Sequence, residues 1–125
     1  MEKVNGTFKT EKGSYGEELA VKFIKEKGYE IIEQNYRYGH GEVDIVAKDK
    51  DTLVFIEVKF RKNLEFGPPE LAVTKSKQKQ VRKISELFIM DKGEKVEFKD
   101  ARIDVIAILK FPNEDPQINH IINAF

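Results

Sequence analysis

The spacing of apolar positions along the chain predicts two helices. The first is expected from about Tyr15 to Lys27, where one apolar stripe is formed by Leu19, Ala20, Phe23 and Ile24. Ser14 and Glu17 have the spacing of a capping box at the start of this helix. A longer helix is expected from about Leu71 to Asp91, and its apolar positions are Val73, Val81, Ile84, Leu87 and Phe88.

Strand-like runs of apolar and β-branched residues account for most of the remaining chain. A polar turn at residues 49–51 joins two of these runs, so they are expected to pair as a hairpin. Arg102 and Asp104 share one face of a later strand and are expected to form an ion pair. The expected strands span residues 29–38, 42–47, 53–60, 95–99 and 102–109, with a further edge strand in 117–125. This order predicts an α/β or α+β fold with a mixed central sheet flanked by helices.

Composition adds limits to this picture. The chain has 125 residues, which fits one domain, with residues 1–13 as a flexible arm and residues 14–125 as the folded part. It has no cysteine, which excludes disulfides, thiolate zinc sites and cysteine nucleophiles and fits a cytoplasmic location. No stretch has the pattern of a signal peptide or a membrane span. Because the formal net charge is zero, any affinity for nucleic acid must come from local patches.

Three charged residues in two adjacent strand-like runs are the main candidates for chemistry. Glu57 and Lys59 interrupt an apolar run and point to one face, and Asp44 comes from the neighbouring run. Charges in a covered strand are costly unless they are paired, bound to a metal or at the strand's open end. The two carboxylates, with the carbonyl of Val58, would hold Mg²⁺ or Mn²⁺, and Lys59 would position a water or stabilise charge on a phosphate.

An ordinary solvated strand face is the alternative for this pair, because Glu-x-Lys spacings are common on exposed strands. Apolar neighbours on both faces weaken that alternative, since Phe55 shares a face with Glu57 and Lys59. The chain shows no serine–histidine pair, so the charged residues suit phosphodiester hydrolysis better than acyl transfer.

Motifs spread over nearly the whole chain resemble the YraN family of small bacterial proteins. They are Gly16-Glu17-x-x-Ala20, Gly28-Tyr29, Asn35-Tyr36-Arg37, residues 41–46, residues 55–61 and the terminal residues 120–125. Asp44 followed by Glu57-Val58-Lys59 also resembles the core of the PD-(D/E)xK nuclease superfamily, with Val43 where the nominal pattern has proline. The family is similar to archaeal Holliday-junction resolvases and other restriction-endonuclease-like folds.

The resemblance implies a restriction-endonuclease-like domain in which Asp44, Glu57 and Lys59 form the catalytic core. It implies that Glu17 is a further acidic residue near the metal, beside its alternative role in the capping box. The implied partner is nucleic acid, with DNA favoured over RNA, and a homodimer is implied because related resolvases are homodimers. The expected activity is metal-dependent cleavage of DNA, including branched or processed structures. The alternatives are a nucleic-acid-binding module with little or no cleavage and a structural protein with a vestigial site.

Basic residues near these strands are candidates for nucleic-acid contacts. Arg61 and Lys62 follow the strand of Glu57 and suit phosphate contacts. Lys77 falls within the apolar stripe of the second helix, so it either extends along the surface to water, which is favoured, or points to Glu57 and assists phosphate binding. The opposite helix face carries a strip for which an ordinary solvated surface is favoured over phosphate binding, formed by Lys75, Lys79 and Arg82.

Overall fold

The computed structural model describes residues 11–125, apart from the side chains of residues 11–14 and 71. Residues 1–10, most of the expected arm, lie outside the described residues. Residues 11–13 belong to the first helix and not to an arm. Within the described part of the chain, no helix is long and apolar enough to cross a membrane.

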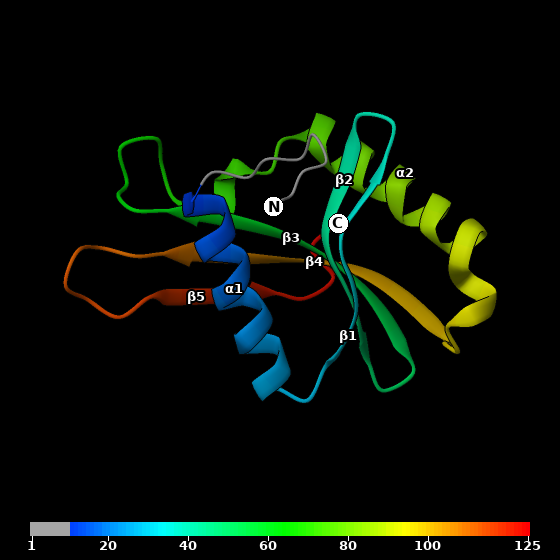
Figure 1. The fold of residues 1–125 in the computed structure, drawn as a ribbon. Coiled ribbons are helices and arrows are strands. Elements are labelled where there is room, and N and C mark those ends of the chain that lie inside the picture. The colour runs from blue at the N-terminus through cyan, green and yellow to red at the C-terminus, as the bar shows by residue number, and fades with distance from the viewer. Residues whose placement is uncertain (1–10) are drawn as a thin grey trace.

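Within residues 11–125, five strands form a mixed sheet accompanied by two long helices (Figure 1). The strands lie in the order β1 Glu30–Tyr38, β2 Gly41–Asp49, β3 Thr52–Arg61, β4 Asp100–Leu109 and β5 Gln117–Ile121. Neighbouring strands are antiparallel, except for the parallel pair β3 and β4. The helices are α1 Glu11–Glu26 and α2 Lys75–Lys92, with short 3-10 helices at Pro69–Ala72 and Gly93–Lys95. The predicted α+β fold with a mixed sheet is confirmed.

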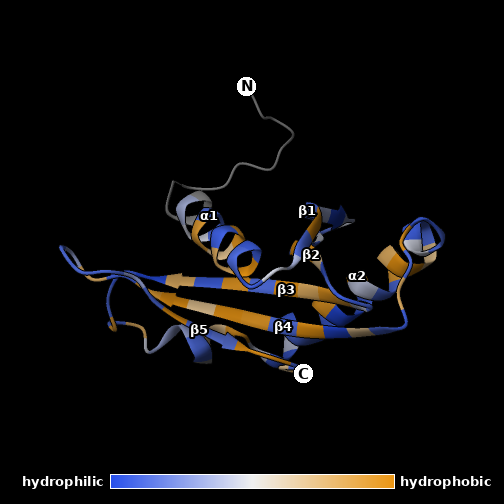
Figure 2. Cartoon of the chain, turned by 90° about the horizontal axis from the view of Figure 1, so that it is seen from below, coloured by the Kyte–Doolittle hydropathy of each residue, from blue (hydrophilic) through white to orange (hydrophobic). Residues whose placement is uncertain are grey.

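The two helices pack on opposite faces of the sheet. Ile24 of α1 is fully buried against one face, and Phe88 of α2 is fully buried against the other. In β3, the neighbours Val54 and Phe55 belong to the α1-side and α2-side clusters respectively. Figure 2 shows the largely hydrophobic strands β3 and β4 with α1 lying over them. This double coverage explains why β3 is a nearly continuous apolar run in the sequence.

Strands β2 and β3 separate part-way along their length. Their pairing runs from Asp49 and Thr52 to Ile45 and Ile56. Beyond Ile56, β3 continues to pair with β4, whereas residues 41–43 of β2 pair with β1. Backbone groups at the point of separation need other hydrogen-bond partners, and side chains from the two strands can supply them.

Two predicted helix starts differ from the structure. Helix α1 begins at Glu11 and not at about Tyr15, so Ser14 lies inside the helix and the predicted capping box with Glu17 is wrong. Helix α2 begins at Lys75 and not at about Leu71. The reason is a cap at Thr74, whose hydroxyl oxygen accepts a 3.1 Å hydrogen bond from the N–H of the third helical residue.

The strand predicted at residues 95–99 is also wrong. Residues 93–95 form a 3-10 helix, and the apolar side chains of Val96 and Phe98 pack against the α2-side core instead of joining the sheet. The carbonyl of Asp51 accepts hydrogen bonds from the N–H groups of Lys99 and Asp100, and β4 begins at Asp100. The predicted hairpin of β2 and β3 and the edge strand within residues 117–125 are confirmed, with β5 ending at Ile121.

Candidate functional site

Asp44 and Glu57 lie next to the point where β2 and β3 separate. The Val58 N–H donates a 2.8 Å hydrogen bond to Oδ2 of Asp44. A side-chain carboxylate thus takes the place of a strand partner and is held in a fixed orientation by the backbone of β3. Both acidic residues are nearly buried, with exposed fractions of 7% for Asp44 and 3% for Glu57.

Glu57 is contacted by two lysines from different elements. Its Oε2 lies 3.2 Å from Nζ of Lys59 and 3.8 Å from Nζ of Lys77. Its other oxygen, Oε1, is buried and has no hydrogen-bond partner among the described residues. Burial, and after it the Asp44 carboxylate, raise the pKa of Glu57 to about 7 against the opposing effect of the lysines. The site therefore holds a carboxyl group that can exchange a proton near neutral pH.

The structure brings four of the predicted residues together: Asp44, Glu57, Lys59 and Lys77. Lys77 reaches Glu57 from the first turn of α2. The favoured prediction, that Lys77 extends along the surface to water, is therefore wrong, and the alternative, that it points to Glu57, is the arrangement in the structure. Gln80 supports it, because the Gln80 side-chain oxygen accepts a 3.0 Å hydrogen bond from Nζ of Lys77. The sequence did not single out Gln80, since an amide one turn along a helix has many ordinary surface roles.

Glu17 lies on α1, on the buried side of the helix with Ala20 and Ile24. In the described part of the chain, no group of three or more His, Cys, Asp or Glu side chains is arranged to hold a metal ion. A metal-binding role for Glu17 stays a prediction, and so does a role for the carbonyl of Val58.

The other predicted cations differ in their exposure. Arg61 ends β3 and is half-buried, and its Nε has no hydrogen-bond partner among the residues that the structure describes. The exposed cations are Lys62 after β3 and, on α2, Lys75, Lys79 and Arg82. Their contacts with nucleic acid remain predictions.

The acidic pair fits a hard divalent cation. Mg²⁺ and Mn²⁺ prefer oxygen ligands, usually one or two carboxylates with waters completing the shell. Asp44 and Glu57 supply the carboxylates, and Oε1 of Glu57 is a buried acceptor that no other described group satisfies. A cation between them would also relieve the repulsion that contributes to the raised pKa of Glu57.

A second polar cluster lies on the α1 side of the sheet, around Asp104 of β4. The Asp104 carboxylate is fully buried and lies 3.0 Å from Nε of Arg102 and 2.8 Å from Nε2 of His120, and it accepts a 2.8 Å bond from the Asn123 N–H. Arg102 also donates a 2.8 Å bond to the hydroxyl of Tyr29. The predicted pair of Arg102 and Asp104 is confirmed, and the cluster joins β4 to β5 and to the turn after α1.

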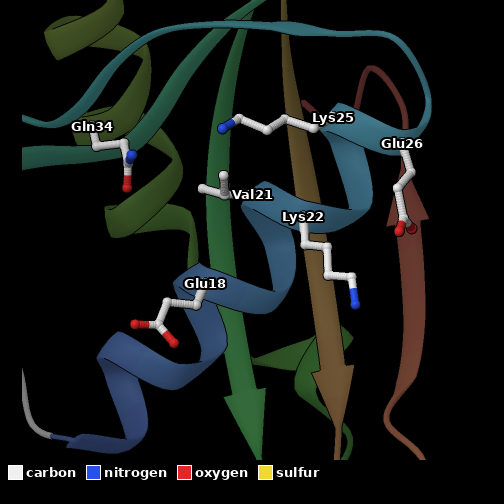
Figure 3. Close-up of a pocket in the computed structure, with 6 residues that line it drawn as sticks. All are labelled: Glu18, Val21, Lys22, Lys25, Glu26 and Gln34. Atoms are coloured by element: carbon white, nitrogen blue, oxygen red, sulfur yellow. The ribbon is translucent and has the colours of Figure 1, made fainter.

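A hollow of about 500 Å³ is lined by residues of α1 and β1 (Figure 3), and neither residue of the acidic pair lines it. Val21 contributes apolar surface, and charged side chains of both signs surround it: Glu18, Lys22, Lys25 and Glu26. Gln34 completes the lining from β1. None of these residues belongs to the predicted site, and the mixed charges favour no particular ligand.

Comparison with known proteins identifies the family. The profile of the uncharacterised protein family UPF0102 matches residues 16–108. The chain belongs to the UPF0102 family. A UPF0102 protein of Geotalea daltonii is 48% identical over 113 residues, which cover 90% of this chain and 87% of that protein. A UPF0102 protein of Caldicellulosiruptor saccharolyticus is 44% identical over 118 residues, 94% of this chain and 98% of that protein. The predicted YraN membership is thereby confirmed, since UPF0102 and YraN denote the same family.

The fold of this chain also has a counterpart among solved structures. It is similar to Hjc of Archaeoglobus fulgidus, a Holliday junction resolvase, with a TM-score of 0.50 and 24% sequence identity. The likeness covers 86% of this chain and 75% of that chain. At this identity it shows the fold alone, and it agrees with the predicted resolvase-like and restriction-endonuclease-like architecture. The segment that matches the UPF0102 profile contains the whole acidic and basic constellation of the candidate site.

Proposed function

We propose that this protein is a divalent-metal-dependent nuclease that hydrolyses phosphodiester bonds in DNA. The observation that carries this proposal is the convergence of two nearly buried carboxylates, Asp44 and Glu57, with the amines of Lys59 and Lys77. A stability requirement alone does not explain a buried carboxylate oxygen that has no hydrogen-bond partner within residues 11–125, or a carboxyl pKa of about 7. The likeness to a Holliday junction resolvase supports DNA, and branched DNA in particular, as the substrate.

Each residue has a definite role in this proposal. Asp44, oriented by the Val58 N–H, and Glu57 would hold Mg²⁺ or Mn²⁺. The bound ion would neutralise charge on the phosphate and lower the pKa of a bound water. Lys59, whose amine is already 3.2 Å from Glu57, would hold the attacking water or stabilise the negative charge that develops on the phosphate. Lys77 would bind a phosphate oxygen from the helix side of the site.

Cleavage of a labelled substrate panel in Mg²⁺ and Mn²⁺ tests the proposed function. The panel holds duplex, single-stranded, flap and four-way-junction DNA, with RNA for comparison. We expect Glu57→Ala and Lys59→Ala to lower the cleavage rate by about 10²-fold or more. Lys95→Ala, at an exposed position beyond α2, is the matched control and should cleave like the wild type.

The outcomes of the panel separate the functions. Cleavage that persists in both site variants would indicate a contaminating nuclease and would contradict the assignment. Metal-dependent binding without cleavage would support the alternative, a nucleic-acid-binding module that keeps the nuclease fold.

Lys77→Ala is expected to lower cleavage at sub-saturating substrate by about tenfold. Lys77 places an amine 3.8 Å from Glu57, so its loss removes a cation from the position proposed for the phosphate. Rates measured over a range of DNA concentrations would show whether the loss lies in binding or in turnover. The Lys95→Ala protein again serves as the control, and a Lys77→Ala rate equal to that of the control would remove Lys77 from the site.

A further inference from the structure

The loop that follows β3 presents two apolar side chains to water. Phe66 is 81% exposed, more than any other large hydrophobic side chain in the part of the chain that the structure describes, and Leu64 is 52% exposed. A single exposed apolar residue is ordinary, but a nearly fully exposed aromatic ring, two positions from a second exposed apolar residue on one short loop, is a candidate contact surface.

The loop is held in shape by its own hydrogen bonds. Oδ1 of Asn63 accepts a 2.9 Å bond from the Glu65 N–H, and the Leu64 carbonyl accepts a 3.0 Å bond from the Gly67 N–H. Gly67 has a φ of +88°, which is a conformation that glycine adopts at little cost. Two prolines follow, and the second, Pro69, is buried. A loop fixed in this way keeps Phe66 away from the core, so the exposure of the ring follows from the conformation of the loop backbone.

The loop is a direct continuation of the strand that carries the candidate site. Glu57, Lys59 and Arg61 alternate along β3 on one face, and exposed Lys62 opens the loop. At a rise of about 3.3 Å per residue, Glu57 and Arg61 are about 13 Å apart. Figure 1 shows the loop projecting beyond the end of the sheet. Cations therefore line the path from the acidic pair as far as Lys62, as a path for a phosphate backbone requires, and Glu65 is the one exposed anion between Lys62 and the ring.

We propose that Phe66 stacks on an unpaired base of a nucleic acid whose backbone is bound at the Asp44–Glu57 site. This inference rests on the proposed function and adds to it the feature that is recognised, an unpaired base, and the residue that recognises it. An aromatic ring can stack on any base, but only where the base is free of its neighbours, as at a flap, a single-stranded end or a branch point. Phe66 would thereby favour branched or partly single-stranded substrates over continuous duplex.

A second copy of the chain is a less suitable binding partner for this loop than an unpaired base. A buried Phe side chain removes about 150–250 Å² from water, whereas a stable interface needs about 800 Å² from each partner. Phe66 and Leu64 alone fall short of that area, but the area is sufficient for one base.

The test measures binding by fluorescence anisotropy, with Ca²⁺ replacing Mg²⁺ to suppress cleavage. The ligands are flap DNA and blunt duplex DNA of matched sequence, and the flap carries 2-aminopurine at its branch. We expect Phe66→Ala to weaken flap binding by about 5- to 100-fold and to abolish quenching of the 2-aminopurine, while duplex binding stays within about twofold. Phe66→Trp should retain both signals. Met90→Ala is the matched control, since Met90 is 80% exposed near the far end of α2 and should bind like the wild type.

Three results would overturn the inference. Equal flap binding by wild type and Phe66→Ala would show that the ring makes no contact, and an equal loss on flap and duplex would show that it does not select unpaired bases. A change from dimer to monomer in Phe66→Ala, seen by light scattering, would assign the loop to an interface between copies. If the wild type binds neither DNA, the proposed function fails together with this inference, whereas the first three results leave the proposed function intact.

Discussion

Replacing Asp104 with alanine is expected to lower the free energy of unfolding by about 3 kcal/mol. The carboxylate is fully buried and accepts bonds from Arg102, His120 and the Asn123 N–H. Burial alone would raise the pKa of Asp104, but these hydrogen bonds hold it below its usual value. Removing the carboxylate leaves Arg102 with only the half-buried Asp49 carboxylate, 3.6 Å away, as a counter-charge among the described residues, and removes the acceptor of the Asn123 N–H after β5. Urea denaturation at neutral pH measures the loss.

Two variants make this result specific. Asp100→Ala, at the exposed start of the same strand, is the matched control and should change stability by less than about 0.5 kcal/mol. Asp104→Asn should be less damaging than Asp104→Ala, because the amide oxygen can still accept from Arg102 or Asn123. A loss below about 1 kcal/mol in Asp104→Ala would contradict the view that this cluster fastens β5 to the sheet.

The sequence was most informative where one physical rule acts alone. β3 was predictable because burial on both faces leaves an apolar run, and its hairpin with β2 because a short polar turn joins two such runs. The errors lie where short-range patterns compete. Val96 and Phe98 have the residue types of a strand, but they cover the core beside α2. At the start of α2, the Thr74 cap prevailed over the helical spacing of the residues before it.

The candidate site was predictable for a similar reason, and only in part. Charges in a covered strand are rare, so Glu57 and Lys59 stood out, and Asp44 followed from the neighbouring strand. Contact between Lys77 and Glu57 was one of two possibilities. Helical geometry places Lys77 on the face of α2 that packs on the sheet, but it does not decide whether the long side chain extends to water or to Glu57. The environment of Oε1 of Glu57, which has no hydrogen-bond partner in the described part of the chain, and the role of Gln80 depend on contacts between distant segments, which no local pattern contains.

Glu57→Gln is expected to make the protein more stable than the wild type above neutral pH. The pKa of Glu57 is about 7 in the folded protein, against an ordinary value of 4.5. The folded state thus holds a proton that the unfolded chain has already lost, so wild-type stability falls as pH rises from 4.5 to 7. Glutamine does not ionise and avoids this loss. Between about pH 5 and pH 8, the stability difference between variant and wild type should grow by about 2–3 kcal/mol in favour of the variant.

Divalent cations should reverse this advantage if the proposed metal site exists. A cation competes with the proton for Glu57, so Mg²⁺ or Mn²⁺ should raise the melting temperature of the wild type more at pH 8 than at pH 5. Glu57→Gln should respond weakly at both pH values, because it lacks one of the two charged ligands. Glu86→Gln, at an exposed position on α2, is the matched control and should follow the wild type throughout. Parallel profiles of stability against pH for wild type and Glu57→Gln would contradict the raised pKa of Glu57. A pH-dependent difference without a response to metal would leave Glu57 as a buried carboxyl group and not a ligand.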